Sequence, residues 1–177
     1  FRKNHQRKFI FTARLNLRIR DKMRIAIVSG NAEGPTELNA FDNALYEAEI
    51  GDVNLIKVSS MLEANTKVER LPKLKAGSMV NCVLSSITSD KPKDKLIACI
   101  AVAIGDELGC VTEKSAVNED IEKVKEEAVK MVRYMMDKRN VEIKELIVEE
   151  AHHTVEEKGS AIAAVVYIRD DIISNRN

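Results

Sequence analysis

Apolar runs of strand length alternate with segments of helical period along the first third of the chain. The run RIAIVS at residues 24–29 predicts a strand, and the glycines and proline of GNAEGPTE after it indicate a loop. From Thr36 the apolar positions follow a helical spacing, and Gly51 is placed to end that helix. The segment VNLIKV at residues 53–58 predicts a second strand. The helix face that we expect to be buried carries Leu38, Phe41, Leu45 and Ala48.

The rest of the chain extends this pattern. In chain order, the predicted elements are strands over residues 79–89 and 96–104, an irregular segment over 105–116, a helix over 118–138, and closing strands around 143–155 and 160–168. The expected buried stripe of the second helix consists of Ile121, Val124, Ala128, Met131, Val132 and Met135. The whole pattern predicts a mixed α/β fold, with a sheet covered by helices.

Composition favours one compact domain that needs neither disulfides nor a metal. The chain has 177 residues, of which 45% are hydrophobic, so it can bury a sizeable core. Its cysteines, Cys82, Cys99 and Cys110, are odd in number and widely spaced, and we expect reduced, mostly buried thiols. The apolar run at residues 96–104 is about half as long as a membrane helix requires. We therefore expect a cytoplasmic protein that is not inserted in a membrane.

The formal net charge of zero conceals an uneven distribution. Residues 1–22 hold eight Lys and Arg and a single acid, which leaves residues 23–177 with 20 basic and 27 acidic residues, a net charge of about −7. An acidic body argues against nucleic-acid binding and suits a cationic substrate. The basic segment could be a nucleic-acid arm, a membrane arm or a targeting peptide. We interpret residues 1–22 as a disordered or non-native extension before a natural start at Met23, and residues 23–177 as the functional domain.

Most of the local motifs point to no particular chemistry. The loop GNAEGPTE lacks the G-K-[ST] of a phosphate-binding loop. His152 and His153 are neighbours on a predicted strand, so their rings should point to opposite faces and cannot bind one metal together. With His5 as the third histidine, there are few candidates for Ser/His or Cys/His catalysis.

Two adjacent serines, Ser59 and Ser60, directly follow the strand predicted at residues 53–58. Such a pair means little alone, since Ser85 and Ser86 form a second one. The first pair differs in its surroundings. Asn54 lies upstream on the same strand, and the preceding helix carries Asn39, Phe41 and Asp42.

With this context, the sequence resembles the pyruvoyl-dependent arginine decarboxylases, self-cleaving enzymes found chiefly in archaea. The segments that carry the resemblance are GPTELNAFDNAL (34–45), GDVNLIKVSSM (51–61), LPKLKAG (71–77) and AVAIG (101–105), within a stretch from about Arg24 to Ile168. The resemblance implies a layered αββα sandwich and cleavage between Ser59 and Ser60. One departure concerns SSMLEANTK, where relatives often carry prolines soon after the serines.

The implied chemistry begins with the making of a cofactor. Decarboxylation leaves a carbanion, and no ordinary side chain can accept its electrons, whereas a ketone can. The Ser60 hydroxyl would attack the Ser59 carbonyl and form an ester, assisted by backbone strain and by a donor to the oxyanion. Asn54 matches the family's residue for that donor. Elimination from the ester then leaves a covalent pyruvoyl group at position 60 and a new chain end at Ser59.

The resemblance also implies the reaction of the mature enzyme. L-Arginine would form a Schiff base with the pyruvoyl group and lose CO2 to give agmatine, a step in polyamine synthesis. By the family pattern the proton donor lies in the loop after AVAI, which places it at Glu113, with Glu107 as the fallback, and burial would have to raise its pKa. Asp42 matches the aspartate that binds the guanidinium, although it could also be a solvated helix residue.

Family members form homotrimers with sites between protomers, so one chain is not expected to complete its pocket. Two other interpretations stay open. The enzyme could decarboxylate another cationic amino acid, or the chain could be a silent paralogue that serves as an assembly subunit.

Overall fold

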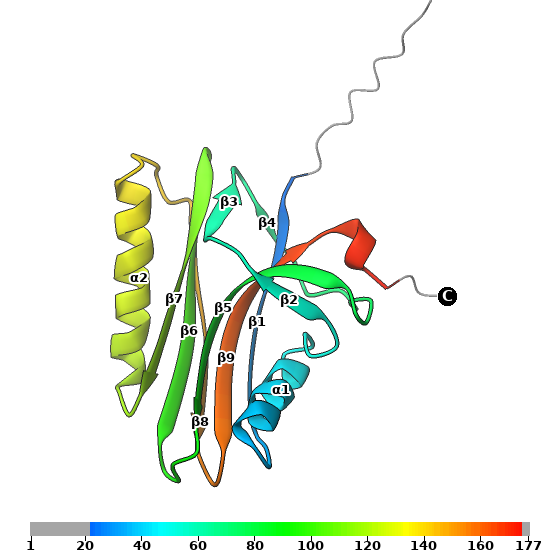
Figure 1. Ribbon diagram of the computed structural model, residues 1–177. Coiled ribbons are helices and arrows are strands. Elements are labelled where there is room, and N and C mark those ends of the chain that lie inside the picture. Colours follow the sequence, from blue (N-terminus) through cyan, green and yellow to red (C-terminus); the bar gives the residue numbers. More distant parts are fainter. Residues whose placement is uncertain (1–21, 175–177) are drawn as a thin grey trace, which may run out of the picture.

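Two β-sheets pack face to face in the computed structural model, which describes residues 22–174 (Figure 1). The elements are, in chain order, β1 (Arg24–Glu33), α1 (Glu37–Glu47), β2 (Asn54–Lys57), β3 (Met61–Glu63), β4 (Lys67–Val68), β5 (Met79–Ser89), β6 (Lys95–Ile104), β7 (Leu108–Val117), α2 (Ile121–Asp137), β8 (Glu145–Thr154), β9 (Gly159–Ile168) and a 3₁₀ turn (Asp170–Ile172). Sheet A has the order β2-β5-β9-β1-β4, and sheet B the order β3-β7-β6-β8. Helix α1 covers sheet A and α2 covers sheet B, which confirms the predicted αββα sandwich.

Strand β6 is buried on both of its faces, and this explains its unbroken apolar sequence. One set of alternating residues packs in the core between the sheets: Leu96, Ala98, Ile100, Val102 and Ile104. The other set packs against α2: Ile97, Cys99, Ala101 and Ala103. The strands predicted at residues 79–89, 96–104 and 160–168 are all confirmed, within one residue at each end.

Strand β1 is longer than predicted, because Gly30 does not begin a loop. The strand continues to Glu33 and pairs along its whole length with β9. A Cβ atom on Gly30 would lie only 2.4 Å from the Ala44 carbonyl oxygen of α1. Gly30 therefore allows the helix to approach the sheet closely, and the glycine that suggested a turn is a packing residue.

Helix α1 begins where predicted, with the Thr36 side chain accepting a hydrogen bond from the Asn39 N–H as an N-cap. Ala48 is buried, as predicted, and Phe41 and Leu45 are partly buried. The other fully buried residues are Ala40 and Ala44, so small side chains face the sheet. Leu38 was predicted to be buried and is 74% exposed. A helix that packs over Gly30 has room for alanines only, so the larger apolar residues lie at the edge of the contact or in solvent.

The irregular segment predicted at residues 105–116 is wrong, since most of it forms strand β7. This strand pairs with β6 on one side and with the short β3 on the other. Gly109 lies between them, and a Cβ atom there would be 2.7 Å from the Ala103 carbonyl oxygen and 3.1 Å from the Leu62 Cβ. Gly109 therefore permits close packing of three strands.

The second helix, α2, is confirmed with an N-cap at Asp120. Its buried stripe is narrower than predicted and consists of Val124, Ala128, Val132 and Met136. Met131 was predicted to belong to it but is 39% exposed. The spacing of four residues keeps the stripe on one line along sheet B, and Met131 lies to one side of that line.

The three cysteines are free and buried, as predicted. Within residues 22–174, no group of His, Cys, Asp and Glu side chains is arranged to hold a metal ion. The same part of the chain has no helix that is long and apolar enough to cross a membrane. Apart from Lys22, the N-terminal extension proposed at residues 1–22 lies outside the described residues.

Candidate active site

The serine pair lies where the chain crosses from one sheet to the other. Strand β2 ends at Lys57 on the edge of sheet A, and β3 begins at Met61 on the edge of sheet B (Figure 1). On one side of the crossing, the Val58 N–H donates to the Cys82 carbonyl at 3.0 Å. On the other side, the Val111 N–H donates to the Ser60 carbonyl at 2.9 Å. The link of two serines is therefore anchored to a different sheet at each end.

Strand β2 is less buried than its apolar sequence suggested. It pairs only with β5, in parallel, and its Ile56 side chain is 39% exposed. Ser59 is exposed and Ser60 is half-buried. The crossing is therefore open to solvent on one side, as an edge strand allows.

A tight turn is centred on Ser60. The Met61 N–H donates to the Ser59 carbonyl oxygen at 3.0 Å, which closes a three-residue γ-turn. The φ angles of Ser59 and Ser60 are not positive, so this is the common inverse form of the turn. The backbone strain expected at the cleavage site is therefore not seen. The turn instead gives the carbonyl of the predicted cleavage site a hydrogen-bond donor.

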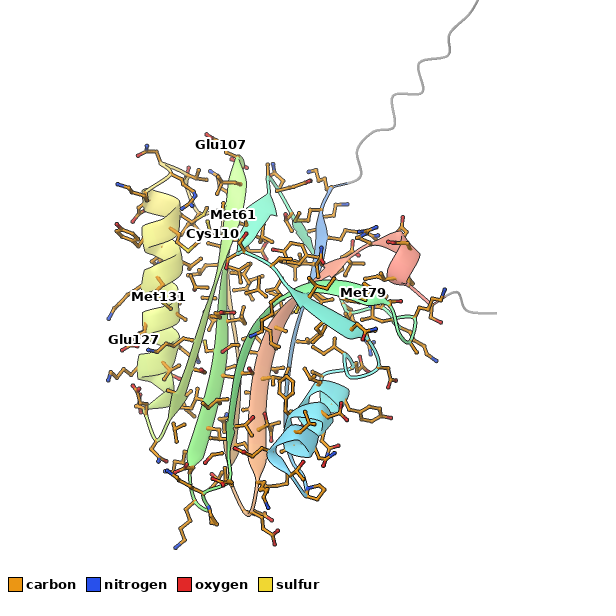
Figure 2. The ribbon with its side chains drawn as sticks, in the orientation of Figure 1. Met61, Met79, Glu107, Cys110, Glu127 and Met131 are labelled. Carbon is orange, nitrogen blue, oxygen red and sulfur yellow. The ribbon has the colours of Figure 1, made fainter. Side chains whose placement is uncertain are left out.

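Met61 is held by contacts from both sheets. Its carbonyl oxygen accepts a hydrogen bond from the Tyr167 hydroxyl of β9 at 3.0 Å. Its sulfur lies 3.9 Å from the Cys110 sulfur of β7, and Figure 2 shows the two side chains next to each other. Burial raises the pKa of both the Tyr167 hydroxyl and the Cys110 thiol, so both groups stay protonated at neutral pH.

Glu113 lies on β7, the strand whose Val111 N–H donates to the Ser60 carbonyl. It follows Val111 by two residues on β7, so the two side chains leave the same face, about 7 Å apart along the strand. Val111 belongs to the core between the sheets, so Glu113 points toward sheet A at the edge of that core. The pKa of the Cys82 thiol is raised to about 11 by burial, lowered somewhat by Lys57 and raised further by Glu113. Lys57 is paired with Cys82 between β2 and β5, and the charges of both Lys57 and Glu113 act on this thiol.

Two details of the Glu113 prediction change. The residue lies in a strand and not in a loop, because β7 begins at Leu108. Its side chain is exposed, so the chain by itself does not provide the burial expected of a proton donor. The fallback, Glu107, lies at the tip of the β6–β7 hairpin (Figure 2), four residues before Val111, whereas Glu113 is two residues after it.

Asn54 and Asp42 do not join this group within one chain. Asn54 begins β2 and precedes Ser59 by five residues, roughly 16 Å at the rise of an extended strand. Its side-chain amide donates to the Gly77 carbonyl at 2.9 Å. Asp42 is exposed on α1, which Figure 1 shows well apart from the link between β2 and β3. The donor to the Ser59 carbonyl in this chain is the Met61 N–H, and the roles of Asn54 and Asp42 stay predictions.

Comparison with known proteins decides the family. The family model described as pyruvoyl-dependent arginine decarboxylase matches residues 24–171. A curated protein of that name from Methanothermobacter thermautotrophicus is 60% identical over 146 residues, which are 82% of this chain and 97% of the relative. This chain belongs to the pyruvoyl-dependent arginine decarboxylase family.

Further members of the family are more distant. The protein from Methanocaldococcus jannaschii is 37% identical over 79% of this chain and 86% of its own length. The protein from Thermococcus sibiricus is 38% identical over 80% of this chain and 92% of its own length. A solved pyruvoyl-dependent histidine decarboxylase is 16% identical, with a TM-score of 0.48 over 57% of this chain and 55% of that one.

The residues around the serine link fit the covalent pyruvoyl group of the family. The Ser60 hydroxyl and the Ser59 carbonyl are neighbours, and the turn supplies a donor to that carbonyl. Both new chain ends would remain held after cleavage, through the Val58 N–H on sheet A and the Ser60 carbonyl on sheet B. Cleavage between Ser59 and Ser60 therefore removes no pairing between strands.

The second serine pair has a structural role. The Ser85 hydroxyl is buried between the sheets and donates to the Lys114 carbonyl of β7 at 2.8 Å. Tyr167, by contrast, is a site residue that the sequence did not reveal. It is 106 positions from Met61 in the chain, and no local pattern marks it.

The histidine pair is also structural. His152 is exposed and His153 is half-buried, in agreement with the predicted opposite faces. The His153 ring contacts the Glu33 carboxylate at 2.6 Å through Nε2 and the Asn31 side-chain oxygen at 3.1 Å through Nδ1. These contacts hold the end of β1 against the β8–β9 hairpin.

Proposed function

We propose that the chain cleaves itself between Ser59 and Ser60 and then converts L-arginine to agmatine and CO2. The observation that carries the proposal is the turn at the serine link, in a chain that belongs to the family. The carbonyl to be attacked already accepts a hydrogen bond from the next backbone N–H. The cytoplasm is the proposed location, as the sequence predicts.

The cleavage uses groups that are already in place. When the Ser60 hydroxyl oxygen adds to the Ser59 carbonyl carbon, negative charge develops on the Ser59 oxygen. The Met61 N–H lies 3.0 Å from that oxygen, within the range in which donors stabilise an oxyanion. If Asn54 also donates to this oxygen, it has to do so from a second protomer.

In the mature enzyme, the pyruvoyl group at position 60 supplies the ketone that accepts electrons as CO2 leaves. Glu113 is the carboxylate placed to return a proton, because it lies on the same face of β7 as the residue that holds the Ser60 carbonyl. Burial of its exposed side chain would have to come from a neighbouring protomer.

A pocket shared between protomers also explains why Asp42 lies apart from the serine link of its own chain. Its carboxylate suits the guanidinium of arginine, since the two groups can form paired hydrogen bonds. In one chain it lies on the outer helix, apart from the serine link. These positions support a homotrimer whose pockets lie between protomers, with Asp42 contributed by a neighbour.

Mixing of inactive chains tests the shared pocket. Asp42→Asn and Glu113→Gln proteins should each be cleaved but release little CO2 from arginine. Trimers that assemble from both should regain part of the activity, because some pockets combine an intact Asp42 with an intact Glu113. If mixed trimers form and show no gain over either variant alone, the shared pocket is refuted.

The substrate is tested by CO2 release from arginine, ornithine and lysine. The proposal predicts turnover of arginine well above that of the two diamino acids, because a carboxylate accepts two parallel hydrogen bonds from one edge of a guanidinium, which an ammonium group cannot offer. Equal turnover of ornithine or lysine would favour another cationic amino acid as the substrate. The Ser60→Ala protein is the control and should release no CO2.

A further inference from the structure

Tyr167 reaches across the sandwich to the residue that follows the cleavage site. It lies near the end of β9 in sheet A and packs against the core between the sheets. Its hydroxyl donates to the Met61 carbonyl of β3, in sheet B, at 3.0 Å. Burial, and to a lesser degree the Cys82 thiol, raises the pKa of Tyr167, so the hydroxyl remains a donor at neutral pH.

The Met61 N–H is aimed by the peptide to which it belongs. This peptide joins Ser60 to Met61, and its carbonyl accepts from the Val111 N–H at 2.9 Å. The described chain has no cis peptide bond, and in a planar trans peptide the C=O and the N–H point in opposite directions. Because the carbonyl is held toward β7, the N–H faces back toward the Ser59 carbonyl.

The following peptide, between Met61 and Leu62, lies in β3, which pairs with β7 of the same sheet. The hydrogen bond from Tyr167 adds a contact from the other sheet to this second peptide, through the Met61 carbonyl. Met61 is thus held on both sides, by β7 of sheet B and by β9 of sheet A. The donor to the Ser59 carbonyl depends on both sheets being in place.

We propose that Tyr167 is a positioning residue for self-cleavage. The hydrogen bond from its hydroxyl to the Met61 carbonyl keeps the Met61 N–H hydrogen-bonded to the Ser59 carbonyl oxygen. This inference rests on the proposed cleavage between Ser59 and Ser60. In the step concerned, a bond forms between the Ser60 Oγ and the Ser59 carbonyl carbon, and the Ser59 C–Ser60 N bond breaks. The hydroxyl proton ends on the Ser60 nitrogen, and the step needs no co-reactant.

The test is a pulse–chase measurement of cleavage of the full chain made by cell-free translation. The 177-residue chain is followed as it gives fragments of 59 and 118 residues. Tyr167→Phe should slow cleavage about five- to tenfold, the effect of one hydrogen bond that acts in the transition state. 4-Aminophenylalanine at position 167 restores a donor and should bring the rate back to within about threefold of the wild type.

Ser85→Ala is the matched control, because it also removes a hydroxyl that donates from sheet A to a backbone carbonyl of sheet B. Both variants should lower the unfolding midpoint by about 2–4 °C, as the loss of one hydrogen bond does. Only Tyr167→Phe should be cleaved slowly. Hydroxylamine cuts the ester directly, so it bypasses the later elimination, and the slow rate should persist in its presence.

The outcomes separate the inference from the proposed function. A wild-type chain that stays uncut refutes self-cleavage itself. If the wild type is cleaved, the role of Tyr167 is overturned when Tyr167→Phe is cleaved as fast as Ser85→Ala, or when hydroxylamine restores its rate. A Tyr167→Phe chain that no longer unfolds cooperatively also overturns it, because the hydroxyl then serves the fold as a whole.

Discussion

Glu33 should contribute measurably to stability, and its contribution should disappear in acid. One carboxylate oxygen accepts from the His153 ring and the Glu156 N–H, and the other from the Glu157 and Lys158 N–H groups. Although partial burial acts to raise it, these hydrogen bonds lower the pKa of Glu33 to about 2. In Glu33→Gln the charge is lost, and an amide NH2 replaces an oxygen that accepts two of the bonds.

The size of the effect follows from the pKa. A carboxyl with an ordinary pKa of 4.5 in the unfolded chain and about 2 in the folded chain stabilises the fold by up to about 3 kcal/mol at pH 7. The side chain is 29% exposed, so solvent screens part of this. We expect Glu33→Gln to lower the free energy of unfolding by about 2 kcal/mol. Because the folded pKa is depressed, the contribution is complete above about pH 5 and is lost as the pH falls toward 2.

The assay is urea unfolding followed by far-UV circular dichroism, at fixed protein concentration and at pH values from 7 to 2.5. The Ser60→Ala background keeps the chain uncut. Glu157→Gln is the control, since Glu157 belongs to the same hairpin and contributes only its backbone N–H to the cluster. The argument is refuted if Glu33→Gln is as stable as Glu157→Gln at pH 7, or if the difference between them does not shrink toward pH 2.5.

Two further predictions follow from the packing and the site. Gly30→Ala places a Cβ atom 2.4 Å from the Ala44 carbonyl oxygen and should cost at least about 2 kcal/mol in urea unfolding. Gly77→Ala, which meets no atom within 4 Å but has a φ of +76°, should cost only about 1 kcal/mol. Glu113→Gln should leave cleavage intact and reduce CO2 release at least about 100-fold, whereas Glu107→Gln should change neither. A Glu113→Gln enzyme with wild-type turnover contradicts the assignment.

Continuous apolar strands were predictable because burial on both faces leaves a strong signal. β6 and β9 are of this kind, and their bounds agree with the prediction within one residue. The errors occur at glycines. Gly30 suggested a loop and Gly109 lies in the segment predicted to be irregular, but each lies where another backbone comes too close for a side chain. Such proximity is a property of the packed sheets, and no single segment contains it.

The predicted buried faces of the two helices were partly wrong for a related reason. Periodicity favoured the larger apolar residues, so Leu38 and Met131 were expected to be buried. The space available over each sheet instead selected small or aligned side chains, such as Ala44 in α1 and Met136 in α2. Sequence alone does not report the distance between a helix and its sheet.

The candidate site was predictable only in part. The motif around Ser59 and Ser60 located the crossing, and it suggested Asn54 as the donor to the oxyanion. The chain instead provides a backbone N–H for that contact, from Met61, held by a tyrosine 106 positions away. A backbone donor has no sequence signature, and a contact over that separation depends on how the two sheets meet.

Intact-mass analysis of the purified protein under denaturing conditions tests the central claim most directly. The account predicts two fragments, residues 1–59 and residues 60–177, the second lighter by one ammonia than simple hydrolysis gives. The Ser60→Ala protein should show one chain of unchanged length. A wild-type protein that remains a single uncut chain, or whose second fragment begins with an ordinary serine, would contradict the account.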